Sequence, residues 1–114
     1  MTTTPTYSME ATELILYTEN DRGTYFAYLE PMLRAATKHY EKGQGDYEKL
    51  LKGFLRVATA SAKQYTLEHG SMAEAWNRVF PMSVRKEVAR HFAEYFLWEY
   101  RAGNKWEIVK GNNK

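Results

Sequence analysis

The sequence predicts an all-α protein: three long helices and one short helix, arranged as an up-down bundle with extended N- and C-terminal segments. Apolar residues recur at spacings of three and four over three long stretches, which is the period of an amphipathic helix. Breaks that contain Gly or Pro lie between these stretches, at residues 43–45, Gly70 and Pro81. Short breaks make consecutive helices antiparallel neighbours. A chain of 114 residues is predicted to be one domain.

The two ends of the chain are predicted to lie outside the helices. Residues 1–13 are polar and rich in Thr, so we expect a flexible arm there. The short apolar run 14–17 is predicted to be an extended segment that packs on the bundle. A single helical domain then covers residues 14–109, and residues 110–114 are predicted to be a disordered tail. Trp106, Ile108 and Val109 could pack on the bundle or pair with residues 14–17 as an edge strand.

The first long helix is predicted from about position 18 to position 42. Thr18 or Asn20 can cap its N-terminus, and acidic residues beside them favour the positive end of the helix dipole. Pro31 lies inside this helix. Since proline lacks a backbone donor and clashes with the preceding turn, we expect a kink or a restart near residues 27–31.

The second long helix is predicted over residues 47–68, with Asp46 as its cap and Gly70 after its end. Ser71 and Glu74 have the spacing of a capping box, which predicts a short helix that ends near Phe80. Pro81 then suits the first turn of the last helix. The predicted inner face of the second helix consists of Tyr47, Leu51, Phe54, Ala58, Ala62 and Tyr65.

The last helix, residues 83–102, is apolar over most of its circumference, which requires cover from several neighbours or from a partner. The stripe expected to face the other two long helices comprises Val84, Val88, His91, Tyr95, Trp98 and Ala102. A second flank of Phe92, Phe96 and Tyr100 exceeds what two helices can cover, so it is the candidate partner face. Its cover could be Trp106, the segment 14–17, a target protein or a second copy of the chain in a homodimer.

No constellation of residues predicts catalysis, a metal site or a cofactor site. The chain contains no Cys, which excludes a thiol nucleophile and a thiolate zinc site. His39, His69 and His91 have no metal-ligand spacing, and phosphate-binding glycine loops and a GxSxG motif are absent. We interpret His91 as a core residue rather than a general base, and Glu87 and Glu94 as part of a solvated, salt-bridged face. We therefore expect no enzyme activity and no cofactor.

Cations gather on one side of each of the first two long helices. The candidate binding residues are Arg34 and Lys38 on the first helix and Lys49, Lys52, Arg56 and Lys63 on the second. If the two rows adjoin, they form a patch that could meet phosphates or an acidic protein surface. An ordinary solvated face is the alternative, and the net charge of +2 is too small to indicate nucleic-acid binding. A helix-turn-helix would instead place Ser83, Arg85 and Lys86 in a DNA groove, against which the aromatic bulk of the last helix argues.

A set of short segments extends over residues 16–104 with characteristic spacing. The segments are LYTENDR at 16–22 with Tyr25, Glu30-Pro31, GDY at 45–47, AKQY at 62–65, EHG at 68–70, FPMSVRKEVA at 80–89 and Gly103-Asn104. Together they resemble a family of small helical proteins of unknown function that bacteriophages and prophages encode. Members of that family usually have a Gly-Thr-Tyr-Asp turn where this chain has GDYE at 45–48, a departure that affects only the turn.

The resemblance implies a phage or prophage origin and a cytoplasmic location in a bacterial host cell, and the absence of Cys fits a reducing compartment. It supplies no activity and no catalytic residues. Small phage accessory proteins often bind a host protein, so we expect this chain to bind one, for example as an inhibitor of a host defence system. The alternative is a nucleic-acid-binding protein that uses the two rows of cations. No apolar run is long enough to span a membrane, so we expect no membrane partner.

Overall fold

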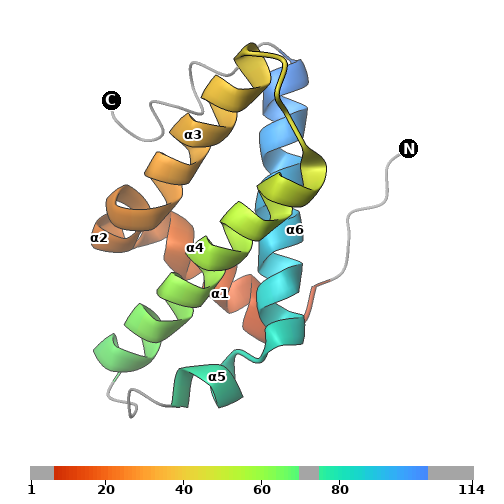
Figure 1. The fold of residues 1–114 in the computed structure, drawn as a ribbon. Helices are drawn as coiled ribbons and strands as arrows, with labels where there is room; N and C mark the ends of the chain where they lie inside the picture. Colours follow the sequence, from red (N-terminus) through yellow and green to blue (C-terminus); the bar gives the residue numbers. More distant parts are fainter. Residues whose placement is uncertain (1–6, 70–74, 103–114) are drawn as a thin grey trace.

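The computed structural model of the chain describes residues 7–69 and 75–102, and all regular secondary structure in these two ranges is helical (Figure 1). The predicted all-α class is therefore confirmed. The predicted capping box at residues 71–74 and the C-terminal segment 103–114 lie outside the described residues. The elements are α1 (Met9–Asn20), α2 (Arg22–Thr24), the π-helical turn η1 (Tyr25–Leu29), α3 (Glu30–Glu41), α4 (Tyr47–Glu68), α5 (Trp76–Val79) and α6 (Met82–Arg101).

Helix α1 corrects the prediction for the N-terminal part of the chain. Residues 9–13 of the predicted arm and the predicted extended segment 14–17 are both helical. The short apolar run is one part of a buried helical stripe that comprises Ala11, Leu14, Ile15 and Thr18. Thr18 can be buried in this stripe because its hydroxyl donates a hydrogen bond to the carbonyl oxygen of Leu14 at 2.7 Å. The description of the fold as three long helices therefore omitted a fourth.

The boundary between α1 and α2 lies at Asp21, and the predicted caps Thr18 and Asn20 are residues of α1 instead. Asp21 has an extended backbone, with ψ of 115°, which ends α1. Its carboxylate accepts hydrogen bonds from the backbone N–H of Thr24 at 3.0 Å and from the Thr24 hydroxyl at 2.8 Å. An aspartate in this position is a favourable N-cap, because it satisfies a donor that has no partner within the helix.

The irregularity predicted near Pro31 takes the form of the π-helical turn η1, just before α3. The backbone N–H of Glu30 donates to the carbonyl oxygen of Tyr25, five residues earlier. Pro31 occupies the first turn of α3, where the donor it lacks is least needed. The helical chain therefore changes register at η1 and continues without a break to Glu41.

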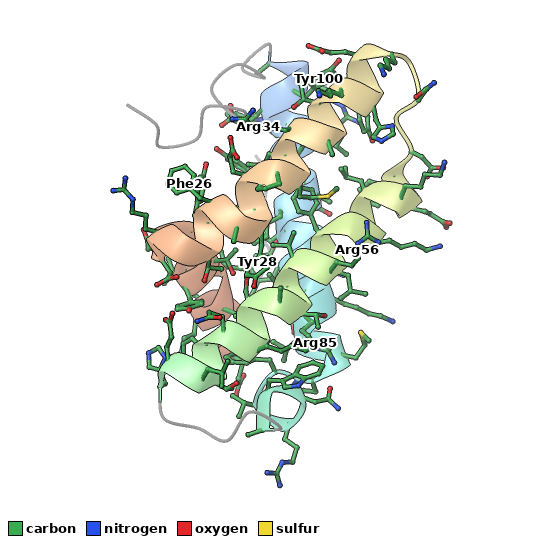
Figure 2. The ribbon with its side chains drawn as sticks, turned by 60° about the vertical axis from the view of Figure 1, so that its left-hand side comes forward. Phe26, Tyr28, Arg34, Arg56, Arg85 and Tyr100 are labelled. Carbon is green, nitrogen blue, oxygen red and sulfur yellow. The ribbon has the colours of Figure 1, made fainter. Side chains whose placement is uncertain are left out.

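Helices α4 and α6 have the bounds that their sequence pattern predicts to within a residue or two, and they make the most extensive helix–helix contact of the fold. Asp46 caps α4 by accepting from the backbone N–H of Glu48 at 2.9 Å. In Figures 1 and 2, α3 and α4 lie side by side and run in opposite directions, and α6 passes behind α4. Helix α1 packs against both α4 and α6.

A glycine permits the close approach of α3 to α4. A Cβ atom at Gly53 would overlap the sulfur and terminal methyl group of Met32, so any other residue there would require this flexible side chain to move. Gly53 is buried in the N-terminal half of α4. Met32 and Gly53 thus lie in direct contact where α3 meets α4.

Candidate functional site

The cations predicted on the second long helix all lie on the exposed side of α4. Lys49, Lys52, Arg56 and Lys63 lie outside the core, whereas the core side of α4 is apolar except for Ser61 and Thr66. The predicted inner face was rotated slightly from the true one: Leu50, with 3% of its surface exposed, faces the core, and Tyr47 is 39% exposed. This small error in the predicted inner face does not change the exposure of the cations, because they lie on the opposite side of the helix.

Two grooves flank this row of cations. The groove between α3 and α4 has a volume of about 280 Å³, and its lining includes Met32 and His39 from α3 with Lys49, Lys52 and Arg56 from α4. The groove between α4 and α6 has a volume of about 530 Å³. It is lined by Glu48, Leu51, Lys52, Leu55, Lys86, Ala89 and Arg90. Lys52 lines both grooves, and Arg56 and Lys63 line a third hollow of about 590 Å³ farther along α4. The cations of α4 and α6 therefore form one surface, the basic face, which comprises Lys49, Lys52, Arg56, Lys63, Lys86 and Arg90.

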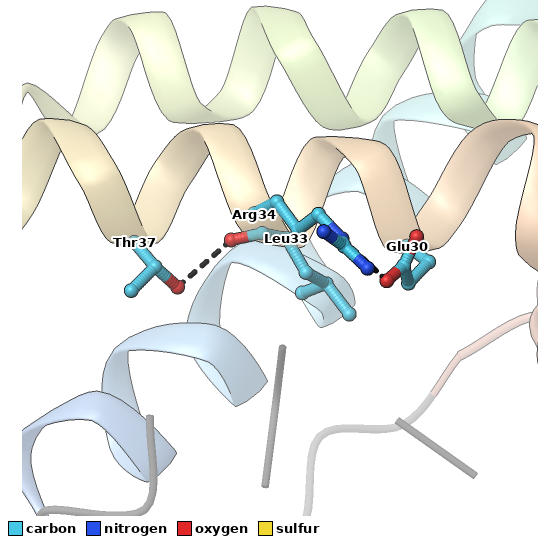
Figure 3. A network of polar contacts seen from close by, with 4 residues as sticks. All are labelled: Glu30, Leu33, Arg34 and Thr37. Atoms are coloured by element: carbon cyan, nitrogen blue, oxygen red, sulfur yellow. Dashed lines mark hydrogen bonds and ion pairs between the residues drawn. The ribbon is translucent and has the colours of Figure 1, made fainter. Parts of the chain in front are cut away.

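The two rows of cations do not adjoin, so the condition for a joint patch with the first helix is not met. The residues of α3 that border α4 include Met32 and His39, and Arg34 and Lys38 lie roughly a third of a turn away round the helix. Figure 2 shows Arg34 on α3 and Arg56 on α4 pointing away from each other. Arg34 is also engaged by Glu30, with its Nε 2.5 Å from the carboxylate oxygen (Figure 3). Two of the six predicted binding residues, Arg34 and Lys38, therefore do not belong to the basic face.

The charges of the basic face are not neutralised by the rest of the described chain. Its Lys and Arg side chains form no ion pair with any other residue in the ranges 7–69 and 75–102. Lys63 packs over the ring of Trp76, with its Nζ 5.0 Å from the ring centroid. The nearest carboxylates along α4 are Asp46, which accepts from backbone N–H groups, and Glu48. The face is thus a positively charged surface with carboxylates at one end.

Arg85 does not present its charge to a partner, which removes the arrangement that a DNA-reading helix would need. It is 5% exposed. Its Nε donates to the carbonyl oxygen of Phe80 at 2.9 Å, and its Nη atoms donate to Thr59 at 3.0 Å and Asn77 at 2.7 Å. Burial lowers the pKa of Arg85 from its ordinary value. This side chain connects α5 to α4 and α6 instead of projecting into solvent.

The candidate partner face on the last helix is largely inside the protein. Phe92 and Phe96 are 1% and 0% exposed, and Tyr100 is half-buried. Helix α3 supplies the missing cover, since the ring of Tyr40 lies 5.5 Å from that of Phe96 and 5.6 Å from that of Tyr100. Phe54 of α4 covers Phe92 at 6.0 Å. The predicted partner face is therefore wrong for both phenylalanines.

The opposite correction applies to part of the stripe that was expected to face inward. Tyr95 is 43% exposed and Trp98 is 65% exposed. His91 is half-buried, with its ring edge-on to Tyr7 at 5.5 Å and its Nε2 4.0 Å from the carboxylate of Glu19. The exposed aromatic surface of α6 thus lies at Tyr95 and Trp98, near the C-terminal end of the helix.

The described residues contain no cluster of three or more His, Asp or Glu side chains that could hold a metal ion. None of the described helices combines the length and the apolar character needed to cross a membrane.

Sequence reasoning missed His39 as a neighbour of the basic face, because the signal for it is the orientation of α3 and not a local pattern. Comparison with known proteins adds no relative: no family model, no curated protein and no solved structure matches this chain.

Proposed function

We propose that this chain is a small binding protein of phage or prophage origin that binds a host protein through the basic face, for example to inhibit a host defence system. The observation that carries the proposal is the set of cations on the outer side of α4 and α6, none of which has an ion-pair partner among the described residues. Cations arranged in this way attract a partner with complementary charge and raise the rate of association. The phage or prophage origin rests on the sequence resemblance alone.

The composition of the basic face favours a protein partner over a nucleic acid. Leu51, Leu55 and Ala89 lie among the cations in the groove between α4 and α6, and Glu48 borders the same groove. A protein surface can offer apolar side chains and both signs of charge, whereas a phosphate backbone is uniformly negative and is repelled by a carboxylate. The mixture of apolar, basic and acidic groups is therefore the pattern of a protein interface.

Removal of charge from the basic face tests the proposal against a matched control. Lys52→Ala with Arg56→Ala removes two charges from the basic face, and Arg34→Ala with Lys38→Ala removes two charges from the outer side of α3. The tagged chain would be used to retain proteins from bacterial cytosol, and the dissociation constant of the purified partner would then be measured for each variant. We expect the basic-face variant to bind roughly tenfold more weakly and the α3 variant to bind like the wild type. Equal binding by both variants would contradict the proposal, as would the absence of any retained protein.

Nucleic-acid binding is the second candidate, and the length of the cation row is the observation that favours it. Lys49 and Lys63 are separated by about 21 Å along α4 at the rise of an α-helix, a distance that spans several phosphates of a duplex. A duplex of about 20 base pairs should then bind at low salt, and the negative slope of log K against log salt should become shallower by about 2 in the Lys52→Ala/Arg56→Ala variant. The lack of any complex at low salt would eliminate this candidate.

A further inference from the structure

A second exposed surface lies on the C-terminal half of α6, on side chains that the basic face does not include. Glu94, Leu97, Trp98 and Arg101, followed by Ala102, line a shallow hollow of about 470 Å³ to which none of the other described helices contributes a side chain. The four residues occupy positions i, i+3, i+4 and i+7, so they share one side of the helix. Trp98 is the most exposed aromatic residue among those described, at 65%. An exposed Trp at the centre of such a strip is typical of an interaction surface.

The charges on this strip stand at its two ends and have opposite signs. Glu94 and Arg101 are about 10.5 Å apart along the helix, too far to pair with each other. Neither forms an ion pair with another residue in the described ranges. The strip therefore presents a carboxylate, an apolar centre and a guanidinium in line, and the two charged groups have no ion-pair complement in the part of the chain that the structure describes.

We infer that this strip binds a second copy of the chain, with the two α6 helices antiparallel about a two-fold axis that passes between Leu97 and Trp98. An antiparallel register that places Glu94 opposite Arg101 of the second copy also places Leu97 opposite Trp98 of the second copy. The symmetry then repeats both contacts, which gives two ion pairs and two apolar contacts. Self-complementarity of this kind is the requirement for a two-fold interface.

The symmetry of the strip selects a second copy over other occupants. Opposite charges at equal distances from an apolar centre complement the same arrangement in a second copy about a two-fold axis, so one pattern satisfies both chains. The interface is small because it uses one helix from each copy, so we expect a reversible dimer with a dissociation constant of roughly micromolar or weaker. The strip shares no residue with the basic face, which it adjoins where Glu94 lies one turn from Arg90. The dimer can therefore form whether or not the proposed function is correct.

Charge reversal gives a test in which the variants check one another. Glu94→Arg places two guanidinium groups opposite each other across the interface, and Arg101→Glu places two carboxylates opposite each other. Each variant alone should therefore dimerise roughly tenfold or more weakly than the wild type. In an equimolar mixture, each variant can pair with the other. The two guanidinium groups of one chain then lie opposite the two carboxylates of the other, so the heterodimer has an opposite-charge pair at each end of the strip. The double variant Glu94→Arg/Arg101→Glu restores both opposite-charge pairs in a homodimer.

The mixture and the double variant should both dimerise like the wild type. Trp98→Ala probes the apolar centre of the strip separately from its charges. It should weaken the dimer by roughly thirtyfold, because a Trp at the centre of an interface is a frequent hot spot.

The measurement is sedimentation equilibrium of the full chain from low micromolar to near-millimolar concentration, with circular dichroism to confirm that each variant keeps its helices. A wild-type chain that remains monomeric over this range overturns the inference. A dimer that survives both single reversals, or a double variant that dimerises no better than either single reversal, overturns it as well. Recovery in the double variant supports the antiparallel register specifically, because this register places the two exchanged charges opposite each other.

Discussion

Replacing Arg85 by Met tests whether the hydrogen bonds of this buried guanidinium hold α5 against α4 and α6. The side chain is 5% exposed and donates to Asn77 of α5, to Phe80 at the end of α5 and to Thr59 of α4. Its guanidinium carbon also lies 4.7 Å from the centroid of the Trp76 ring. Methionine fills a similar volume but can make none of these hydrogen bonds, so the change removes the polar contacts while it largely preserves the packing.

The expected loss of stability follows from two opposing contributions. Three hydrogen bonds from a charged donor contribute about 5 kcal/mol together, when each is assigned the lower part of its usual range. Burial of the guanidinium costs about 3 kcal/mol in lost hydration, which the methionine variant does not incur. The free energy of unfolding should therefore fall by about 2 kcal/mol, the difference between these two contributions. For a domain of this size, that decrease corresponds to a fall in Tm of about 8 °C.

The assay is urea unfolding followed by circular dichroism, with Arg90→Met as the matched control. Arg90 lies on the same helix and is exposed, so its replacement should change the free energy of unfolding by no more than about 0.5 kcal/mol. Asn77→Ala provides a further check. In the wild-type background it removes one acceptor of Arg85, whereas in the Arg85→Met background the same change should have almost no effect.

The result that would refute this reasoning is a stability of Arg85→Met within about 0.5 kcal/mol of the wild type. It would mean that the lost hydration of the guanidinium offsets all three hydrogen bonds. An Asn77→Ala effect of equal size in both backgrounds would show that Asn77 and Arg85 are not coupled.

Two further predictions concern single contacts. Burial and the hydrogen bond that Tyr17 donates to Glu68 at 2.6 Å raise the pKa of Tyr17 to about 12 from an ordinary value of 10.0. The stability that this contact contributes is therefore complete below pH 10 and is lost as the pH rises through about 12. Tyr17→Phe should therefore lower the free energy of unfolding by about 1 kcal/mol near neutral pH, and its difference from the wild type should vanish as the pH passes the raised pKa. Urea unfolding at several pH values measures this difference, and a difference that does not change with pH would contradict this account. Asp46→Ala should cost about 1 kcal/mol in the same assay because the N-cap of α4 is lost, whereas Asp46→Asn keeps an acceptor and should cost only a few tenths; equal losses in the two variants would argue against a capping role.

The helices that could be predicted from the sequence are those with long periodic patterns and clear ends. Helix α4 has Asp46 as its cap, and α6 follows Pro81, and both have almost the predicted bounds. Helix α1 was missed because its apolar residues do not mark a single face: Met9 and Leu16 are exposed at 86% and 52%, whereas the polar Thr18 is buried. The π-helical turn before Pro31 was predicted only as an irregularity. Proline has no backbone N–H to donate, and this fact alone does not determine which hydrogen-bond pattern the preceding residues adopt.

The candidate site divides in the same way. The spacing of Lys49, Lys52, Arg56 and Lys63 places them on one side of any regular helix, so their common position on the outer side of α4 could be predicted from the sequence. The neighbours of that row could not, because they depend on how α3 and α6 lie against α4. The position of α3 depends on contacts between residues that are distant in the sequence, such as Met32 and Gly53.

The sequence by itself determined the helical class, the ends of the longest helices and the cations that α4 presents to solvent, because local periodicity and capping decide these features. Only the tertiary structure decided which aromatic side of α6 is inside. Both sides of that helix are apolar, so its own pattern does not distinguish Phe92 and Phe96 from Tyr95 and Trp98. Tyr40 of α3 covers Phe96, and Phe54 of α4 covers Phe92. Trp98 remains exposed on the strip that we infer to bind a second copy.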